Sequence, residues 1–264
     1  MTSSHVRDLL SLRGKTALIT GASGHLGSAM ALALAEAGAT VVASSRDRNK
    51  ARAIAETLPR EAEQQHCGVE IDQISEQSIN SGFQHAIETA GQIDILINNG
   101  HAALGSDWRD VTAEEFNQQL ANATGYFLLA RQFREHVVSR EVGGSIILLG
   151  SMYGSVGSYP DAYDGVVPAS PVAYHTLKGG ILQMTRHLAV YWAKDGVRVN
   201  SLSPGPFPSE RASPEMVARL IAKSPMGRVG RPEELKGAVV FLASEASSYM
   251  TGQNLIIDGG WTAW

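Results

Sequence analysis

Short apolar runs alternate with longer segments of helical spacing along the whole chain. The apolar runs lie at residues 16–20, 40–43, 93–97, 145–149, 197–202 and 255–257. They lack the polar–apolar alternation of half-exposed strands, which is typical of strands buried on both faces of a parallel sheet. The segments with helical spacing lie at residues 26–37, 48–57, 75–90, 113–139, 172–194, 214–221 and 232–244.

This alternation predicts an α/β fold, a doubly wound parallel sheet of the Rossmann-like kind with helices on both faces. The chain has 264 residues, enough for one large domain or two small ones. It contains no linker-like change in composition and no repeat at a fixed period. We therefore expect a single domain over residues 1–264, in which residues 1–14 form an N-terminal arm.

Composition and charge exclude several other kinds of protein. A net charge of −4 and a pI near 6.1 give no basic surface for nucleic acid. No apolar run approaches the length of about 18 residues that a membrane helix needs, and the eight histidines are too dispersed for a metal site. The only cysteine, Cys67, cannot form an internal disulfide. We expect a cytoplasmic protein with a small-molecule substrate and without metal, membrane or nucleic-acid partners.

A glycine-rich turn follows the first apolar run. Residues 21–27 read GASGHLG and lead directly into a helical segment. Glycines in such a turn let the backbone approach a pyrophosphate without Cβ clashes. The helix that follows presents free N–H groups and a positive dipole end to the phosphates. Because the motif lies between a strand and a helix, it predicts a dinucleotide-binding site.

The candidate catalytic residues lie on a later helix and at the end of a strand. Tyr174 and Lys178 are four positions apart, so their side chains share one helix face. The lysine is expected to lower the pKa of the tyrosine from about 10 toward the working range. Tyr174 could then remove a proton from an alcohol or donate one to a ketone. Ser151 follows the run at 145–149, at a strand end where α/β sheets bind ligands.

With these motifs, the chain resembles the short-chain dehydrogenase/reductase family over nearly its whole length. The matching motifs, in family order, are Thr20–Gly27, Asp72, Asn98-Asn99-Gly100, Ser151, Tyr174, Lys178, Asn200, Pro204-Gly205-Pro206 and Asp258-Gly259-Gly260. The resemblance implies an enzyme that transfers a hydride between NAD(P) and a secondary alcohol or ketone, with Tyr174 as general acid/base. It also implies a homo-tetramer or homo-dimer joined through residues 113–139 and 172–194.

The resemblance assigns roles to further residues. Asn122 would anchor a water in a proton relay through Lys178, so that the catalytic set is Asn122, Ser151, Tyr174 and Lys178. Lys178 would also bind the nicotinamide ribose. The full set of cofactor-binding residues would be Gly21, Ser23, His25, Leu26, Ser45, Arg46, Asp72, Asn99, Gly100, Tyr174, Lys178, Pro204, Gly205, Phe207 and Ser209.

Three features depart from the family pattern. The turn reads TGxxGxxG rather than TGxxxGxG, because its middle glycine is Gly24. The asparagine motif continues with Gly100 and His101 where the family usually has Ala-Gly, and His101 either faces the site or is an ordinary loop residue. More residues separate Ser151 from Tyr174 than is usual, so residues 152–170 form an inserted loop.

The end of the second predicted strand distinguishes NAD from NADP. An acidic residue there would bind the ribose 2′-hydroxyl of NAD. Ser45 and Arg46 occupy these positions instead, and a hydroxyl beside a guanidinium suits a 2′-phosphate. The residues therefore favour NADP over NAD, although an arginine that only lies along the adenine would select neither cofactor.

The inserted loop and a second segment, the substrate lid at residues 206–226, suggest the substrate class. The loop is rich in tyrosine, serine and aspartate, which suits a hydroxylated ligand because buried hydroxyls need partners. We expect a polyol, sugar or sugar acid, bound by Ser151, Tyr153, Tyr159 and Arg211. Alternatively, the loop is outer decoration or a subunit contact. The terminal Trp264 is expected at a subunit contact or near the active site.

Two other functions compete with this one. A 3-oxoacyl-thioester reductase of the same family is the main alternative, and it would need a cationic surface for an acidic carrier protein. A non-catalytic NAD(P)-sensing protein is more remote, because such a protein should have lost the catalytic residues.

Overall fold

Seven parallel strands form one sheet in this computed structural model, which describes residues 5–61 and 64–263. The strand order is β3-β2-β1-β4-β5-β6-β7. The strands are β1 Thr16–Ile19, β2 Thr40–Ser45, β3 Cys67–Glu70, β4 Ile95–Asn98, β5 Gly144–Leu149, β6 Val197–Pro204 and β7 Asn254–Ile257. The predicted doubly wound parallel sheet is confirmed.

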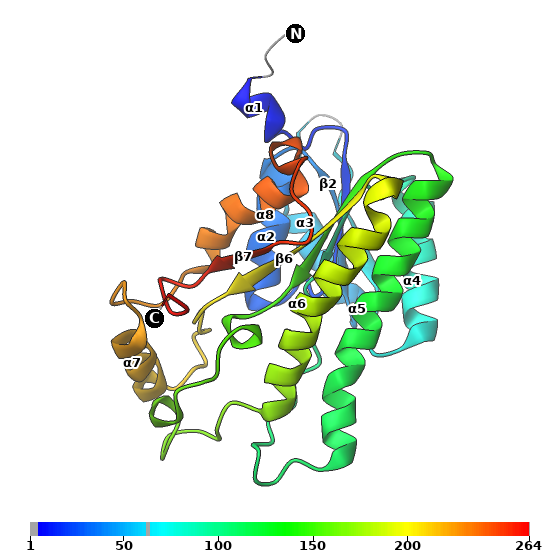
Figure 1. Ribbon diagram of the computed structural model, residues 1–264. Coiled ribbons are helices and arrows are strands. Elements are labelled where there is room, and N and C mark those ends of the chain that lie inside the picture. The colour runs from blue at the N-terminus through cyan, green and yellow to red at the C-terminus, as the bar shows by residue number, and fades with distance from the viewer. Residues whose placement is uncertain (1–4, 62–63, 264) are drawn as a thin grey trace.

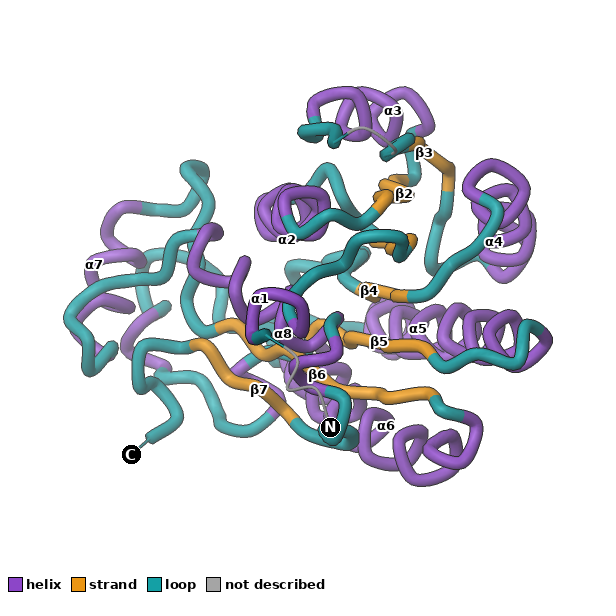
Figure 2. Tube along the Cα trace, turned by 90° about the horizontal axis from the view of Figure 1, so that it is seen from above, coloured by secondary structure: helices purple, strands orange, loops and turns teal. Residues whose placement is uncertain are grey.

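Helices cover both faces of this sheet. They are α1 Val6–Leu9, α2 His25–Glu36, α3 Arg48–Thr57, α4 Glu76–Ala90, α5 Ala113–Ser139, α6 Val172–Trp192, α7 Pro214–Lys223 and α8 Lys236–Ala243. Figure 2 shows α2, α3 and α8 on one face, and α4, α5 and α6 on the other. Within the described ranges, no helix is both long enough and apolar enough to cross a bilayer.

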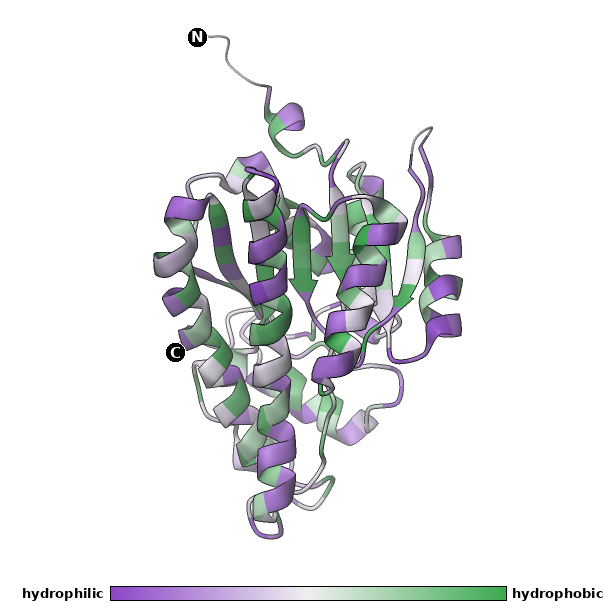
Figure 3. Cartoon of the chain, turned by 90° about the vertical axis from the view of Figure 1, so that its right-hand side faces the viewer, coloured by the Kyte–Doolittle hydropathy of each residue, from purple (hydrophilic) through white to green (hydrophobic). Residues whose placement is uncertain are grey.

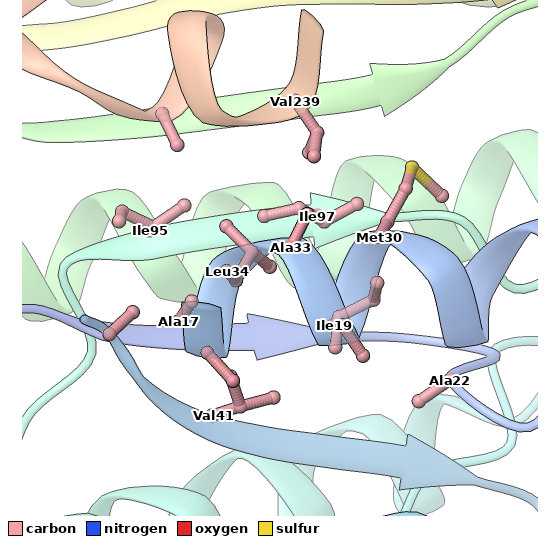
Figure 4. Packing of buried hydrophobic residues seen from close by; sticks show 14 of the residues in the cluster. Ala17, Ile19, Ala22, Met30, Ala33, Leu34, Val41, Ile95, Ile97 and Val239 are labelled. Atoms are coloured by element: carbon pink, nitrogen blue, oxygen red, sulfur yellow. The ribbon is translucent and has the colours of Figure 1, made fainter. Parts of the chain in front are cut away.

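Each face of the sheet has its own apolar core. Successive strand residues point to opposite faces, so Ile19 packs with Met30 and Leu34 of α2, while Leu18 packs toward Leu129 of α5. Figure 4 shows the first of these cores between α2, α8 and the strands. In Figure 3, the central strands are mostly hydrophobic, whereas the helices in front of them carry many hydrophilic residues. This two-sided burial explains why the strands read as continuous apolar runs.

The prediction missed one strand and merged two elements. β3 is absent from the predicted apolar runs because its sequence, Cys-Gly-Val-Glu, contains a single large apolar side chain, the buried Val69. Residues 232–244, predicted as one helix, form a short 3-10 helix, Pro232–Leu235, followed by α8. The predicted helix at 172–194 ends at Trp192 and continues as a 3-10 turn. The N-terminal arm contains α1.

The inserted loop and the substrate lid pack against each other. The loop contains the 3-10 turns Met152–Gly154 and Pro160–Ala162, and the lid contains α7. Lys223 of α7 forms a 2.6 Å ion pair with Asp161, and Trp261, which is 2% exposed, packs in a cluster with residues of both segments. Figure 1 shows this unit at the lower left, beyond the carboxyl ends of the strands. The predicted contact of Trp264 lies outside the described residues.

The buried His66 and the half-buried His136 each accept a hydrogen bond from a backbone N–H group. His66 Nδ1 accepts from Val41 at 3.0 Å while its Nε2 binds the carbonyl of Pro59 at 2.8 Å. His136 Nε2 accepts from Ile93 at 3.1 Å. Burial lowers the pKa of both imidazoles below the ordinary 6.5. Both nitrogens that accept these bonds must therefore be unprotonated in the folded protein.

This arrangement predicts a loss of stability in mild acid. The unfolded chain binds protons on these histidines below about pH 6.5, whereas the folded chain resists them. The contribution of these histidines to the free energy of unfolding is therefore complete above that pH. It falls as the pH drops toward their pKa values in the folded protein. Thermal unfolding should show a lower Tm at pH 5 than at pH 7.5. His66→Gln should reduce this pH dependence, whereas the exposed His187→Gln should not; an unchanged wild-type Tm would contradict the prediction.

Candidate active site

A groove of about 590 Å³ runs across the carboxyl ends of the central strands. It lies where the strand order reverses between β1 and β4, the position at which open α/β sheets bind ligands. The groove brings together these predicted residues: Gly21, Ser23, His25, Leu26, Ser45, Arg46, Asp72, Asn99, Gly100, Ser151, Tyr174, Lys178, Pro204, Gly205 and Phe207. Asn122, Tyr153, Tyr159, Ser209 and Arg211 are not part of its lining.

The glycine turn forms the floor of the groove. Gly21 has a φ of +62°, and a Cβ on it would lie 2.8 Å from the Cα of Gly100. A Cβ on Gly27 would lie 2.1 Å from the carbonyl oxygen of Gly21. Gly24 is the N-cap of α2 and supplies no side-chain cap, so the first N–H groups of the helix remain available to an anion. The turn thus fits a pyrophosphate despite its altered spacing.

Asn99 ties the ends of β1 and β4 together. Its Nδ2 donates to the carbonyls of Thr20 at 2.9 Å and Gly21 at 3.1 Å. The hydroxyl of Thr20 in turn accepts from the backbone N–H groups of Asn99 at 2.9 Å and Gly100 at 2.8 Å. Asn99 therefore fixes the shape of the groove through the backbone around it.

Two cations and two hydroxyls line one end of the groove. Ser23 donates to Ser45 at 3.4 Å, and Arg46 and Lys50 line the same groove. Asp47 also lines it, but its carboxylate caps α3 by accepting from two backbone N–H groups. Sequence reasoning missed Lys50. Its place four residues after Arg46, in the first turn of α3, could have indicated a second cation for the cofactor. This corner suits a phosphate better than it suits a ribose hydroxyl that needs a carboxylate partner.

Tyr174, Lys178 and Ser151 meet at the other end of the groove. Lys178 is 4% exposed and donates through Nζ to the carbonyl of Leu149, the last residue of β5, at 2.6 Å. The same Nζ lies 5.6 Å from the ring centroid of Tyr174. Ser151 and Tyr174 both line this end of the groove. Helix α6 and strand β5 thus bring residues that are distant in the sequence to one point.

The pKa of Tyr174 differs from the sequence expectation. Burial raises it above the ordinary 10, and the Ser151 hydroxyl opposes this rise only in part. Burial also lowers the pKa of Lys178 to about 7, so the lysine is only partly charged near neutral pH. The expectation that Lys178 lowers the pKa of Tyr174 was wrong, because burial penalises the charged form of both groups.

Asn122 organises the loop after β4. Its Oδ1 accepts from Gln73 Nε2 at 2.6 Å and from the backbone N–H of Ala102 at 2.8 Å. Its Nδ2 donates to the carbonyls of Ala102 at 3.1 Å and Gln119 at 2.9 Å. Two acceptor and two donor positions are the whole capacity of an asparagine side chain. The side chain therefore has no remaining position for the predicted water.

The predicted substrate residues of the loop and lid, and the predicted cofactor residue Ser209, do not line the groove. The hydroxyl of Tyr153 bonds that of Tyr163, and its ring stacks on His175 with centroids 4.5 Å apart. Tyr159 packs edge-on against Trp261 at 5.3 Å. Ser209 and Arg211 are exposed. These tyrosines pack against α7 and a tryptophan far along the chain, and their contact with the substrate stays a prediction.

Gly100 leaves room for Gln73. A Cβ on Gly100 would lie 2.2 Å from the Gln73 Oε1 atom, and the bond to Asn122 holds that amide in place. The family usually has alanine at this position, which would compete with Gln73 for the same space. Sequence reasoning missed Gln73, and the unusual glycine was the available signal.

This contact predicts the outcome of a double-mutant cycle. Gly100→Ala should displace the Gln73 amide from Asn122 and destabilise the protein by about 1–2 kcal/mol. In a Gln73→Ala background, Gly100→Ala should reduce the free energy of unfolding by less, because the Gln73 amide that clashes with the new methyl group is absent. Gly105→Ala is the matched control, since a Cβ there meets nothing within 4 Å. Additive changes in unfolding free energy would show that the two residues do not compete for space.

Comparison with known proteins gives the family. The model described as "Enoyl-(Acyl carrier protein) reductase" matches residues 21–262. The chain is 33% identical over 274 residues to "Galactitol 2-dehydrogenase (L-tagatose-forming)" of Cereibacter sphaeroides, covering 98% of this chain and 99% of the relative. It is 31% identical over 255 residues to "3-oxoacyl-[acyl-carrier-protein] reductase FabG" of Aquifex aeolicus, covering 95% and 98%.

A solved structure agrees with these relatives. The crystal structure of a gluconate 5-dehydrogenase from Burkholderia cenocepacia J2315 in complex with NADP and tartrate has a TM-score of 0.88. It is 29% identical in sequence, and the comparison covers 98% of this chain and 100% of that one. Together with the groove and its residues, these matches show that the chain belongs to the short-chain dehydrogenase/reductase family and is an NAD(P)-dependent alcohol dehydrogenase/ketoreductase.

Proposed function

We propose that this enzyme interconverts a secondary alcohol and a ketone of a polyol, sugar or sugar acid, with NADP as the preferred cofactor. The observation that carries the reaction is the meeting of Ser151, Tyr174 and Lys178 at one end of the groove, with the Lys178 Nζ 5.6 Å from the ring centroid of Tyr174. A general acid/base must lie within hydrogen-bond reach of the oxygen that it serves. Ser151 and Tyr174 together can hold one substrate oxygen in that position.

The protein residues divide the work in the following way. Tyr174 donates its phenolic proton to the oxygen during ketone reduction and takes a proton back during alcohol oxidation. Its raised pKa keeps it protonated near neutral pH, which suits the reductive direction. Lys178 stays near its ring and is available to a ribose hydroxyl. The bound nicotinamide supplies or accepts the hydride.

Polar groups around Tyr174 support a hydroxylated substrate. His101 lines the groove with Tyr174, and Ser151 offers a second hydroxyl contact. The similarity to a galactitol dehydrogenase and to a gluconate dehydrogenase with bound tartrate supports the same class. The relative named as a 3-oxoacyl reductase keeps the thioester alternative open to test. The intact set of Ser151, Tyr174 and Lys178 argues against a purely cofactor-sensing role.

The proposal extends to roles, assembly and location. Asn122 positions the loop after β4, since its side chain is saturated by that loop. Assembly as a tetramer or dimer through α5 and α6 is supported by Val190 and Tyr191 of α6, which are 77% and 63% exposed. A cytoplasmic location is consistent with the single Cys67, which requires no oxidising compartment.

Tyr174→Phe tests the catalytic assignment. The change removes only the hydroxyl that exchanges the proton, so kcat should fall by about 10²-fold or more while cofactor affinity stays close to that of wild type. The assay follows absorbance at 340 nm with NADP⁺ or NAD⁺ and a panel of polyols, sugars, sugar acids and simple alcohols. Wild-type rates from Tyr174→Phe would refute the role. Turnover of an acetoacetyl thioester alone would move the assignment to the thioester reductase.

Arg46 and Lys50 test the cofactor preference. Removing either cation should weaken the binding of a 2′-phosphate by about 1–3 kcal/mol, the value of a charge-assisted hydrogen bond. Arg46→Ala and Lys50→Ala should therefore raise the Kd of NADPH about tenfold or more, and the Kd of NADH much less. The exposed Arg48→Ala, in the first turn of the same helix but not in the groove lining, is the matched control. Equal losses of affinity for NADPH and NADH would show that Arg46 and Lys50 do not select between the two cofactors.

A further inference from the structure

His101 lies against the catalytic tyrosine, at a position where the family motif usually has glycine. Its ring centroid is 5.4 Å from that of Tyr174, and the two rings are tilted by 58°. It lines the same groove as Ser151 and Lys178. A substrate oxygen bound to Tyr174 therefore has an imidazole next to it.

Gln119 of α5 fixes the protonation of this imidazole. The Gln119 side chain is buried, and its Oε1 accepts from the backbone N–H of Leu104 at 3.0 Å. Its Nε2 therefore faces His101 Nε2, at 2.5 Å. An amide nitrogen can only donate, so His101 Nε2 must be the unprotonated acceptor. The ring proton then resides on Nδ1, which becomes a hydrogen-bond donor.

The imidazole stays neutral in this position. Burial and the nearby Lys178 lower the pKa of His101 to about 4. Tyr174 and Gln119, the other groups against the ring, bring no negative charge that would oppose this effect at neutral pH. His101 is therefore a fixed, uncharged donor rather than a proton-transfer group.

We propose that His101 determines substrate specificity by donating its Nδ1 hydrogen to an oxygen on the carbon next to the reacting one. The site would then prefer vicinal diols and α-hydroxy ketones over isolated alcohols and ketones. A substrate without that second oxygen would cover this donor without pairing it, which lowers the affinity for such a substrate. Gln119 is the positioning residue that sets the tautomer. This inference rests on the proposed function and narrows its substrate class.

The test compares butane-2,3-diol with butan-2-ol, which differ by one hydroxyl. With NADP⁺ or NAD⁺, wild-type enzyme should show a kcat/KM at least about tenfold higher for the diol. His101→Phe keeps an aromatic ring against Tyr174 and removes both nitrogens. It should abolish most of this selectivity, mainly by raising KM for the diol. The matched control is His175→Phe, whose imidazole stacks on Tyr153 outside the groove lining; it should retain the wild-type ratio.

Gln119→Glu tests the tautomer separately. The carboxylate can still accept from Leu104, but it now demands a proton on His101 Nε2 and raises the pKa of the ring. The ratio of KM for the diol to KM for butan-2-ol should therefore gain an inflection between about pH 5 and 8 that the wild-type ratio lacks, since titration of Lys178 affects both alcohols alike. A flat profile would overturn the assignment of Gln119.

The remaining outcomes separate the inference from the function beneath it. Equal loss of both substrates in His101→Phe, or no preference for the diol in wild type, overturns the inference and leaves alcohol oxidation standing. Failure of wild type to oxidise either alcohol or any member of the wider panel overturns the proposed function, and the inference with it.

Discussion

The close approach of two strand ends, β1 and β4, is the constraint on which the rest of the active site depends. A Cβ on Gly21 would lie 2.8 Å from the Cα of Gly100, so the two backbones touch. Asn99 closes this contact with bonds to the carbonyls of Thr20 and Gly21. Because the strand order reverses here, successive crossovers leave toward opposite faces and the groove opens between them. Its floor is therefore backbone, and side chains arrive only at its two ends.

The catalytic end of the groove is a set of buried polar groups, each held by a specific partner. Lys178 donates to a strand carbonyl, Asn122 uses its full capacity on its neighbours, and Gln119 holds both Leu104 and His101. A buried polar group without partners would destabilise the fold, so these bonds fix one arrangement of the loop after β4. Among the described residues, Gln73 Oε1 is one of the few buried side-chain atoms left without a partner. It lies beside Gly100, where the family would usually place a methyl group.

The inserted loop and the substrate lid act as one structural unit rather than as two independent flaps. Tyr153, Tyr159 and Trp261 form an aromatic cluster with α7, and Lys223 and Arg219 bind the loop through Asp161. The tyrosines that composition assigned to the substrate pack within this unit. The residues after β4, in contrast, line the groove itself.

The sequence by itself determined the fold class, the position of the groove and most of its lining. Continuous apolar runs identify buried strands, and the glycine turn, Ser151 and the Tyr174–Lys178 pair mark strand ends and one helix face. β3 was missed because its one large apolar side chain, Val69, does not make a continuous apolar run. The tertiary structure decided everything that depends on contacts between distant segments. Burial reversed the expected pKa shift of Tyr174. The tyrosines of the inserted loop pack against Trp261, which is far along the chain. Gln119 turned His101 toward the site, because hydrogen bonds and burial depend on neighbours that the order of residues does not reveal.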